Sequence, residues 1–584
     1  MLKIKHLKDG FSALYKKERI IFYVATILLC VSFLFMVSKL NEKFLVAIPE
    51  DGGSISEGIV GTPTLVNPVV AITDADKDMV ALVYSGLLRK SANGDYLPDL
   101  AKEYTISPDG TVYTFILKDN LTFHNESPIT ANDVVFTINK IQDPLIKSPK
   151  KTQWEGVNVT APDPKTVVFT LKQPYGSFLA NATVGILPEG IWKNISPAEF
   201  GLSNLNIKAI GSGPYMITKV DHTDEGIPNV YNLVRFKEFA LGTPHVKRIT
   251  IKSYANEKEL VQNLKSGSVD QAGGISPSYA ETIKSTATIA TSVLPRTFGI
   301  FFNQAQNKIL ADSTVRKSID IGIDRKSIID EVLKGYGIMI NSPIPASKKS
   351  SATSNEIVAF DQSKQQAIDL LEKNGWKVGV DGIREKGTAT SVTTGTGKNK
   401  KTTVVEKGPK TRLSFTITTG DTKELTETAG LVQSEMLALG IEVNVKVYET
   451  GALNSLIRTR NYEALLFGQV VNSDGDMFAF WHSSQRNDPG LNIALYTNPL
   501  ADTALEQIQK ITLKEEKQKK YDTLDTLFKS GIPAVFIYSP EYIYAVSRKL
   551  SLQDHFRTTI PSDRFATVYL WYIESDMVWK IFVK

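Results

Sequence analysis

Cysteine is almost absent from this chain of 584 residues, because Cys30 is the single one. One cysteine can form no disulfide within the chain, so the folded part must depend on its hydrophobic core for stability. Cys30 also lies inside a long apolar run, which leaves the rest of the chain without a thiol nucleophile. The sequence therefore excludes a disulfide-stapled fold and a cysteine-dependent enzyme.

Histidine is scarce as well, and the six histidines lie far apart, without a His-Glu-x-x-His spacing. The chain has no Gly-x-Ser-x-Gly elbow and no Gly-Lys-Ser/Thr phosphate loop. Acid pairs such as Asp474 and Asp476 are expected by chance among 62 acidic residues. We therefore expect no catalytic residue, no metal and no cofactor, and a binding protein rather than an enzyme.

Positive charge is concentrated at the N-terminus. Residues 1–43 contain eight Lys and Arg against three acids, which leaves 59 basic and 59 acidic residues in the remainder. A neutral body gives no reason to expect a nucleic-acid partner. The basic stub instead precedes 18 uncharged residues, Ile20 to Val37, which as a helix would be about 27 Å long and could cross a bilayer.

The basic residues before this apolar segment indicate its orientation. We expect residues 1–19 in the cytoplasm, a single-pass plasma-membrane anchor at 20–38, and the main body outside the cell or in a periplasm. A cleaved signal peptide is the alternative interpretation. The apolar run is longer than a usual signal core, and Ser38–Asn41 offers no cleavage site of small residues, so the sequence favours an uncleaved anchor.

The exported body has an α/β pattern throughout. Capping residues and periodicity predict helices at Ala131–Lys140, Asp312–Ile323, Arg325–Leu333, Asp361–Asn374, Leu425–Leu439, Pro499–Lys510 and Glu515–Lys529. Residues 441–447 alternate as a strand with one exposed face, and 532–538 are apolar enough for a buried strand. Short strands between residues 97 and 171 predict a β-rich subdomain. Residues 385–411, rich in Thr, Gly and Lys, predict an exposed insertion, either a hairpin or disordered.

The stretch Gly211-Ser-Gly-Pro-Tyr215 has the glycines of a phosphate-binding loop. Such a loop needs backbone N–H groups that lead into a helix, but Pro214 lacks one and residues 215–220 alternate like a strand. The sequence therefore predicts a bend at which the glycines permit a sharp turn.

Several motifs occur in the order found in one known family. They are Val83-Tyr-Ser-Gly-Leu-Leu-Arg89, Tyr96-Leu-Pro-Asp-Leu-Ala101, Ser107-Pro-Asp-Gly110, Pro128-Ile-Thr-Ala-Asn-Asp133, Gly211-Ser-Gly-Pro-Tyr215 and Asp312-Ser-Thr-Val-Arg316. Together the motifs resemble the peptide- and nickel-type extracellular solute-binding proteins, family 5, which serve ABC importers. The resemblance extends over roughly residues 45–570.

The resemblance implies a two-lobed α/β fold of the periplasmic-binding-protein type (type II), which closes on its ligand. Lobe one would comprise residues 44–80, 205–298 and 535–575, with 81–204 as its inserted β-rich subdomain, and lobe two would comprise 299–534. The chain would cross between the lobes near residues 297–303 and 532–544. The expected hinge residues are Phe298, Phe302, Asn303 and Tyr538.

A permissive peptide receptor should bind the peptide backbone as an added strand, because main-chain hydrogen bonds do not depend on side-chain identity. The resemblance places the receiving strand at residues 464–471, with the loop 62–67 facing it from lobe one. Gly468 would let a second backbone approach closely. The candidate ligand-binding residues are Gly468, Gln469, Val470 and Val471 on the strand and Thr64, Leu65, Val66 and Asn67 on the loop.

Many peptide-binding members of the family hold the ligand's ammonium group with an aspartate just after this strand. A gap-free alignment puts Val471 or Asn472 at that position, while Asp474 and Asp476 follow a few residues later. Either aspartate could take the role if the loop is shifted. Trp481 could line a side-chain pocket or belong to the core.

The resemblance thus implies a membrane-anchored receptor with a monomeric outer part. It would capture an oligopeptide or similar small solute and deliver it to an ABC permease in the membrane, and a metal complex or sugar in place of peptide is left open. Two other functions also remain open: a membrane-anchored ligand sensor or scaffold with the same fold, and an extracellular hydrolase with an unrecognised site.

Overall fold

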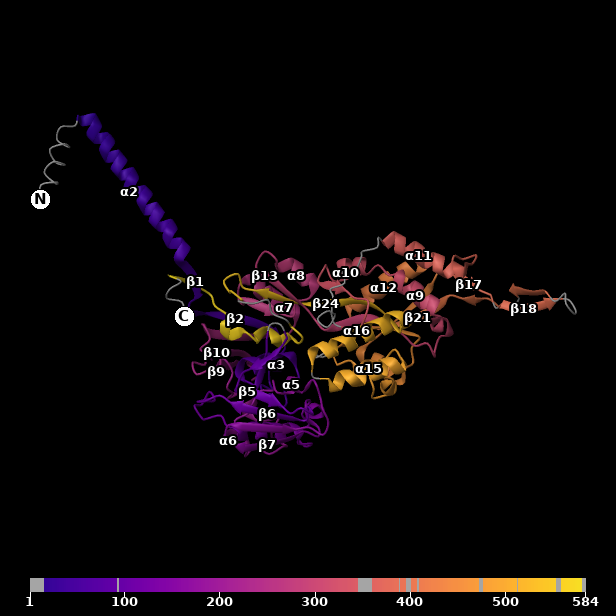
Figure 1. Ribbon diagram of the computed structural model, residues 1–584, viewed down its shortest axis with the longest axis horizontal. Coiled ribbons are helices and arrows are strands. Elements are labelled where there is room, and N and C mark those ends of the chain that lie inside the picture. The colour runs from indigo at the N-terminus through magenta and orange to yellow at the C-terminus, as the bar shows by residue number, and fades with distance from the viewer. Residues whose placement is uncertain are drawn as a thin grey trace.

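A computed structural model of the chain describes residues 15–91, 94–344, 360–387, 389–394, 401–406, 409–471, 476–511, 513–552 and 558–579. Two lobes lie side by side, a β-rich subdomain extends from the first lobe, and helix α2 projects from that lobe (Figure 1). The α/β class predicted from the sequence is confirmed.

The first lobe is built on one end of a large mixed sheet, in the order β12-β2-β11-β10-β9. Helices α7 and α8 cover one face, and α3 lies on the other, inside the lobe's main core. Helix α7 begins after Asn256, whose side chain accepts from the Glu259 N–H, and ends at left-handed Gly267. The bounds are α3 Asp74–Val83, α7 Glu257–Ser266, α8 Pro277–Ile283, β2 Gly52–Val60, β9 Tyr215–His222, β10 Pro228–Arg235, β11 Val246–Tyr254, β12 Gln271–Gly273 and β13 Thr288–Val293.

The inserted subdomain contains an antiparallel sheet in the order β5-β6-β8-β7. In β6, Tyr113, Phe115 and Leu117 are buried and alternate with partly exposed residues, as the sequence pattern predicts. These residues share one core with the first lobe. The bounds are β3 Leu88–Lys90, β4 Tyr96–Pro98, β5 Ala101–Ile106, β6 Val112–Leu117, β7 Asn158–Asp163, β8 Thr166–Thr170, α4 Ala131–Gln142, α5 Phe178–Asn181 and α6 Glu189–Trp192.

The second lobe continues the large sheet in the order β22-β21-β23-β14-β24. Both faces are buried, since the neighbouring residues Ile300 and Phe301 of β14 pack into different cores. Helices α9 to α12 contribute to one core and α13 to α16 to the other. The bounds are α9 Ser313–Ile321, α10 Arg325–Val332, α11 Phe360–Lys373, α12 Lys423–Ala438, α13 Thr450–Thr459, α14 Phe478–Trp481, α15 Pro499–Lys510, α16 Lys514–Gly531, β14 Arg296–Phe302, β15 Gly337–Met339, β21 Ser414–Gly420, β22 Glu442–Tyr448, β23 Ala464–Val470 and β24 Ala534–Val546.

A small extension of the second lobe contains the Thr-, Gly- and Lys-rich insertion. Strands β16 (Lys377–Val378), β17 (Arg384–Lys386) and β20 (Thr411–Arg412) form a short sheet. Strands β18 (Ala389–Thr394) and β19 (Lys401–Glu406) pair antiparallel and project away from the lobe (Figure 1). Of the two forms expected for this insertion, the structure has the hairpin.

The two lobes are joined where two chain segments cross. Strand β24 pairs with β14 of the second lobe at Ala534–Tyr538 and with β13 of the first lobe at Glu541–Val546. The neighbouring crossing is the turn between β13 and β14, at residues 294–296. The hydroxyl of Ser539 lies 2.9 Å from the carbonyl oxygen of Leu294 and 2.5 Å from that of Arg296, so it holds the two crossings together.

The bend predicted at Gly211-Ser-Gly-Pro214 is present, and strand β9 begins directly after it. Neither Gly211 nor Gly213 has a positive φ. A Cβ atom on Gly211 would instead lie 2.1 Å from the Val83 carbonyl oxygen, and one on Gly213 would lie 2.5 Å from the Val83 carbonyl carbon. The glycines allow the bend to pack against the end of α3.

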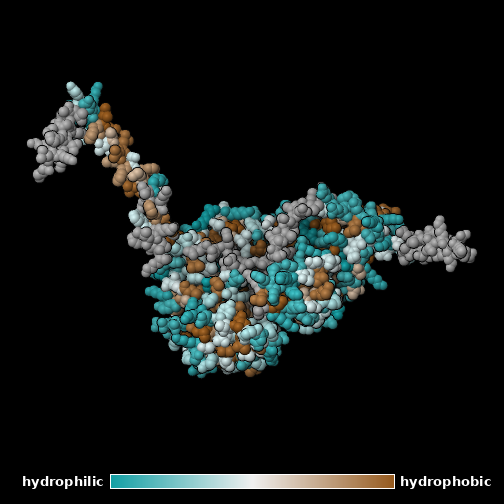
Figure 2. Space-filling view, viewed as in Figure 1, coloured by the Kyte–Doolittle hydropathy of each residue, from teal (hydrophilic) through white to brown (hydrophobic). Residues whose placement is uncertain are grey.

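Helix α2 (Lys16–Phe44) contains the apolar run expected to cross a membrane, and its long apolar side chains are exposed to the surroundings (Figure 2). By length and composition, Lys16–Val37 could span a bilayer. Strand β1 (Leu45–Pro49) follows α2 directly and pairs with β25 (Ser575–Trp579) near the other end of the chain. The ring centroids of Phe44 and Trp579 lie 6.4 Å apart, where α2 meets the β1–β25 pair.

Candidate functional site

A cavity of about 610 Å³ lies where the two lobes meet. Helix α3, the inserted subdomain and the segment 559–569 line most of it, all from the first-lobe side. Val470 and Val471, at the end of β23, line it from the second lobe. Of the predicted strand residues, the structure therefore places Val470 and Val471 at an interlobe cavity.

The edge of β23 near this cavity lacks a strand partner among the described residues. On one side, β14 pairs with β23 along its whole length. On the other side, β21 pairs only with Ala464 and Leu465, and the hydroxyl of Thr419 donates to the carbonyl of Leu466. Backbone groups alternate between the two sides of an antiparallel strand, so those of Gly468 and Val470 point to the unpaired side.

One hydrogen bond at the end of β23 supports this alternation of backbone groups. The Val471 N–H donates to the Pro295 carbonyl at 2.8 Å, which shows that the backbone groups of odd-numbered residues point toward β14. The side chain of Val470 is 53% exposed, whereas Val471 and Gln469 are buried. Gln469 makes no side-chain hydrogen bond to any described residue. Of this group, Val470 offers both an unpaired backbone and an accessible side chain.

Gly468 makes room for a neighbouring aromatic side chain. A Cβ atom at this position would lie 2.6 Å from the ring of Phe298, which covers the glycine from the neighbouring strand. Phe298 in turn stacks on Tyr538, with ring centroids 5.0 Å apart. The absence of a side chain at Gly468 therefore makes room for Phe298, and a ligand backbone would reach Gly468 along the strand edge.

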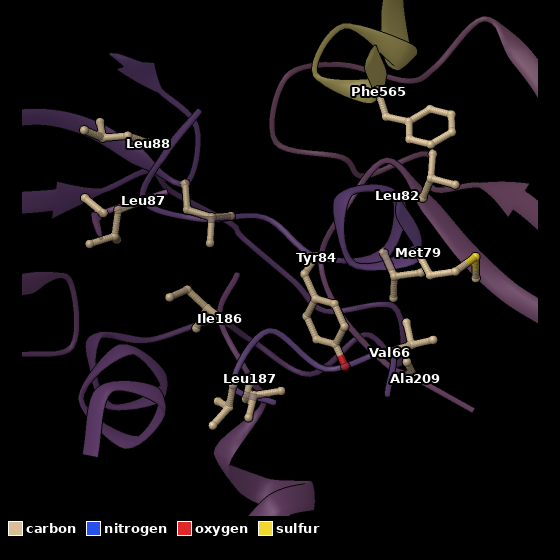
Figure 3. Close-up of a cluster of buried hydrophobic side chains, with 14 of the residues drawn as sticks. Val66, Met79, Leu82, Tyr84, Leu87, Leu88, Ile186, Leu187, Ala209 and Phe565 are labelled. Carbon is tan, nitrogen blue, oxygen red and sulfur yellow. The ribbon is translucent and has the colours of Figure 1, made fainter. Parts of the chain in front are cut away.

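The loop 62–67, which the resemblance places opposite β23, is held by hydrogen bonds within its own lobe. The backbone N–H groups of Thr64 and Leu65 donate to the buried carboxylate of Asp76, at 2.9 and 2.8 Å. The Asn67 side chain bonds Asn206 at 3.0 Å. Val66 lies in the apolar cluster around Tyr84 (Figure 3). Of these four candidate residues, Val66 and Asn67 are fully buried, Thr64 is exposed and Leu65 is partly exposed. None of the four lines the cavity.

The loop after β23 is only partly described. Asn472 and Asp474 lie outside the described residues. Both carboxylate oxygens of Asp476 accept hydrogen bonds, one from the Phe478 N–H at 3.0 Å and one from the Gln509 side chain at 3.1 Å. Asp476 thus starts the short helix α14 and ties it to α15.

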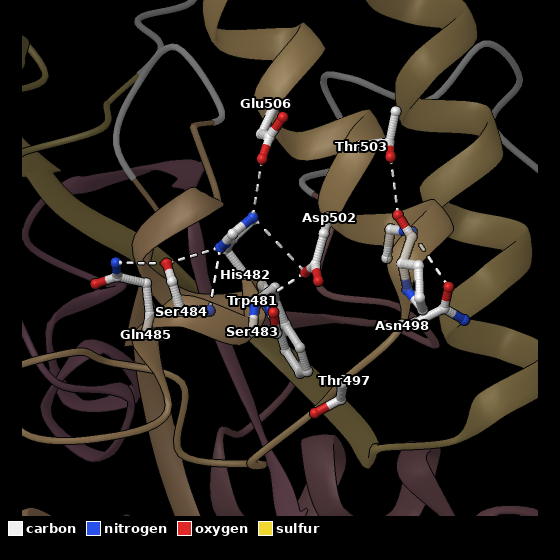
Figure 4. A network of polar contacts seen from close by, with 12 residues as sticks. Trp481, His482, Ser483, Ser484, Gln485, Thr497, Asn498, Asp502, Thr503 and Glu506 are labelled. Atoms are coloured by element: carbon white, nitrogen blue, oxygen red, sulfur yellow. Dashed lines mark hydrogen bonds and ion pairs between the residues drawn. The ribbon is translucent and has the colours of Figure 1, made fainter.

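Trp481 belongs to the core of the second lobe, since it is fully buried against Phe301, Phe528 and Phe536. The neighbouring His482 points the other way (Figure 4). Its Nε2 lies 3.4 Å from Glu506, and Nδ1 lies 2.7 Å from the Ser484 hydroxyl. These polar contacts link α14 to α15 and do not line the cavity.

The expected hinge residues lie at different distances from the crossings. Phe298 and Tyr538, whose rings stack on each other, lie next to the crossings. Phe302 and Asn303 are buried at the far end of β14, where Asn303 bonds the backbone of Glu463 and Arg460 at 2.8 and 2.9 Å. The boundary between the lobes falls at residues 294–296, because Arg296 already pairs with β23.

The cavity also contains charged residues that the sequence prediction did not select. They are Lys77, Arg89, Lys90, Asp99, Lys150 and Asp563. Burial raises the pKa of the Asp99 carboxyl to about 7, although Lys118, the Ser85 hydroxyl and Arg89 act in the opposite direction. Asp99 stood in a motif that carried the family resemblance, but nothing in the sequence distinguished the lysines from ordinary surface lysines.

Comparison with known proteins identifies the family. The family model for bacterial extracellular solute-binding proteins, family 5 middle, matches residues 95–490. The chain belongs to this family. Among the part of the chain that the structure describes, no group of three or more His, Cys, Asp and Glu is placed to hold a metal ion.

Individual relatives agree over most of the chain. The oligopeptide-binding protein AppA of Bacillus subtilis is 26% identical over 522 residues, 88% of this chain and 91% of that protein. Its structure in complex with a nonapeptide has a TM-score of 0.63 at 24% identity, covering 90% of this chain and all of AppA. The crystal structure of NikZ from Campylobacter jejuni with Ni(L-His) has a TM-score of 0.65 at 25% identity, with the same coverage. The two-lobed solute-binding fold implied by the sequence resemblance is thus confirmed.

Proposed function

We propose that this extracellular solute-binding protein captures a peptide between its lobes and delivers it to an ABC importer in the membrane. The observation that carries the proposal is the unpaired edge of β23 at Gly468 and Val470, beside a cavity of about 610 Å³. An extended peptide added to this edge would satisfy its backbone groups. AppA, similar over 88% of this chain, is named for oligopeptide binding, which supports the same ligand class.

The contact surface on the first lobe is narrower than the sequence suggested. The N–H groups of Thr64 and Leu65 already bond Asp76, so they are not available to the ligand. The peptide backbone would therefore be held chiefly by β23, while the cavity wall of the first lobe contacts its side chains. Closure of the lobes would exclude water and strengthen each polar contact.

The N-terminal helix would anchor this receptor. In support, β1 follows α2 without an intervening loop and pairs with β25, so the helix continues into the folded body. We expect a tag placed before residue 1 to remain on the full-length chain in the membrane fraction. Recovery of a shortened chain in the soluble fraction, without the tag, would contradict the anchor and indicate a cleaved signal peptide.

Backbone recognition makes a specific prediction for binding. The full chain in detergent should be stabilised by short peptides in a thermal-shift screen, because a ligand that binds only the folded state raises its apparent stability. Methylation of a single peptide-bond nitrogen in a bound peptide removes one main-chain donor. At alternate positions, methylation should weaken binding about 10-fold or more. The loss combines a hydrogen bond between neutral groups, worth about 1 kcal/mol or more, with the steric clash of the methyl group.

A matched control is provided by side-chain changes in the same peptide. Neutral substitutions that leave the backbone unchanged should alter calorimetric affinity less than N-methylation at the same residue. The proposal is wrong if no peptide binds. Strand addition in particular is wrong if N-methylation is tolerated at every position.

A further inference from the structure

The interlobe cavity has an excess of positive charge. Four of its lining residues are cations and two are carboxylates, as given above for the described chain. Lys90 is neutralised within the wall, because its ammonium lies 3.2 Å from the Asp563 carboxylate. Asp99 is the remaining carboxylate, and Lys118 and Arg89 are the cations that act on it electrostatically. This leaves Lys77 and Lys150 without a carboxylate partner inside the cavity.

Lys150 is placed against the first lobe by its neighbours. The hydroxyl of buried Ser148 donates to the Val69 carbonyl at 2.6 Å and accepts from the Lys150 N–H at 3.2 Å. The helical turn Lys151–Trp154 begins directly afterwards. The chain therefore holds Lys150 next to the segment that precedes α3, and both Lys150 and Lys77 line the cavity.

The ammonium group of Lys150 forms no hydrogen bond or ion pair with any residue that the structure describes. Burial lowers its pKa, and the positive charge of Lys77 adds to the effect. Among the described residues, the ammonium of Lys77 pairs with the exposed Asp74 on the same helix, at 3.4 Å. Two nearby cations without a buried counter-charge repel each other, and an anion between them would relieve this cost.

We propose that Lys150 and Lys77 form a carboxylate subsite that selects solutes bearing an anionic group at the first-lobe wall. The inference rests on the proposed peptide-binding function and adds a ligand class to it. The carboxylate would come either from an acidic side chain or from the C-terminus of the bound peptide. A charge-assisted hydrogen bond to such a carboxylate would supply both affinity and specificity.

The test uses the full chain in detergent and calorimetric titration of defined peptides. The probes are penta-alanine, its C-terminal amide, and pentapeptides with one Glu or Gln placed at each position in turn. The wild-type chain should bind at least one anionic peptide about 10- to 100-fold more tightly than its neutral counterpart, the range expected for one hydrogen bond to a charged group. Amidation that removes the preference identifies the C-terminus as the source, and a Glu-over-Gln preference identifies a side chain.

The variants locate the effect. Lys150→Gln should abolish the preference, Lys77→Gln should reduce it, and Lys150→Arg should retain it. Lys151→Gln is the matched control, because this adjacent lysine does not line the cavity. A preference that survives in Lys150→Gln, or an equal affinity of wild type for anionic and neutral peptides, would overturn the subsite while leaving peptide binding intact. Failure of every peptide to bind would overturn the proposed function and the subsite together.

Discussion

His124 connects the inserted subdomain to the bend before β9 through both of its ring nitrogens. Nε2–H donates to the Gly213 carbonyl at 3.0 Å, and Nδ1 accepts from the Gly211 N–H at 3.4 Å. This pair of contacts requires a neutral ring, since a proton on Nδ1 would remove the acceptor. Burial lowers the pKa of His124 to about 4, against the smaller effect of the Gly213 hydrogen bond.

His124 should therefore make stability depend on pH. In the unfolded chain its pKa is near 6.5, so between pH 6.5 and 4 the unfolded state binds more protons than the folded state. The free energy of unfolding should fall as the pH is lowered through that window, by roughly 3 kcal/mol at most. His124→Gln should be less stable at pH 7 but lose less stability on acidification. Urea denaturation at several pH values would show this, and parallel pH profiles for both proteins would contradict it.

Gly213 shows how far the sequence leads at a single residue. The sequence predicts a bend at residues 211–214 whose glycines permit a sharp turn, and the structure adds the group that a side chain would meet there, the backbone of Val83. At Gly468 the sequence predicts access for a second backbone, and the structure adds that the glycine makes room for Phe298. Contacts of this kind join residues over a hundred positions apart, so the local sequence holds no sign of them.

A glycine substitution tests the packing of the bend. Gly213→Ala should lower the free energy of unfolding by about 1–3 kcal/mol, because the new Cβ would overlap backbone atoms of Val83 and Tyr84 that cannot move aside freely. Gly430→Ala is the matched control in helix α12, where a Cβ meets nothing within 4 Å. That variant should be stabilised by roughly 0.5–1 kcal/mol. Equal effects in chemical denaturation would refute the packing explanation.

Among the elements, helices were predictable because their end signals are local. Asp312, Asp324 and Asn498 each accept a hydrogen bond from the first turn of the helix that follows, as their positions in the sequence suggest. Strand β24 was predicted for 532–538 but continues through Pro540 to Val546, because it pairs with one lobe and then with the other. That continuation depends on partners in both lobes and could not be derived from the run itself.

The candidate site likewise contains features that the local sequence predicts and features that depend on distant contacts. Strand β23 and its exposed Val470 follow from an apolar run that ends in a polar loop. The loop 62–67 was chosen by resemblance, and its interior is taken up by hydrogen bonds to Asp76 and Asn206. Lys150 entered the cavity only through the contacts of Ser148 with Val69. A lysine becomes a candidate for ligand binding when folding half-buries it in a cavity without a partner among the described residues, which composition and spacing do not reveal.

At the scale of the whole molecule, the lobes share strand β24, and a side-chain hydroxyl joins the two crossings. The Ser539 hydroxyl contacts carbonyl oxygens on both sides of the turn between β13 and β14. The Leu294 N–H donates to the Pro540 carbonyl at 3.0 Å, which adds a backbone link at the same place. These contacts lie at the crossings, about which one lobe would turn against the other. A further contact lies away from the crossings, where the Gly176 N–H of the inserted subdomain donates to the Gln509 carbonyl of α15 at 2.8 Å.

Removal of the Ser539 hydroxyl should loosen both crossings at once. In Ser539→Ala, the carbonyl oxygens of Leu294 and Arg296 lose the one hydroxyl proton that lies between them, and the free energy of unfolding should fall by about 1–3 kcal/mol. Hydrogen exchange should quicken at the amides of Leu294 and Arg296, while amides in β6, far from the crossing, keep their protection. Ser530→Ala is the control, because this exposed hydroxyl bonds only its own helix, at Leu527. If exchange at the crossings is unchanged in Ser539→Ala, the backbone pairing of β24 alone sets the lobe junction, and the hydroxyl contributes nothing to it.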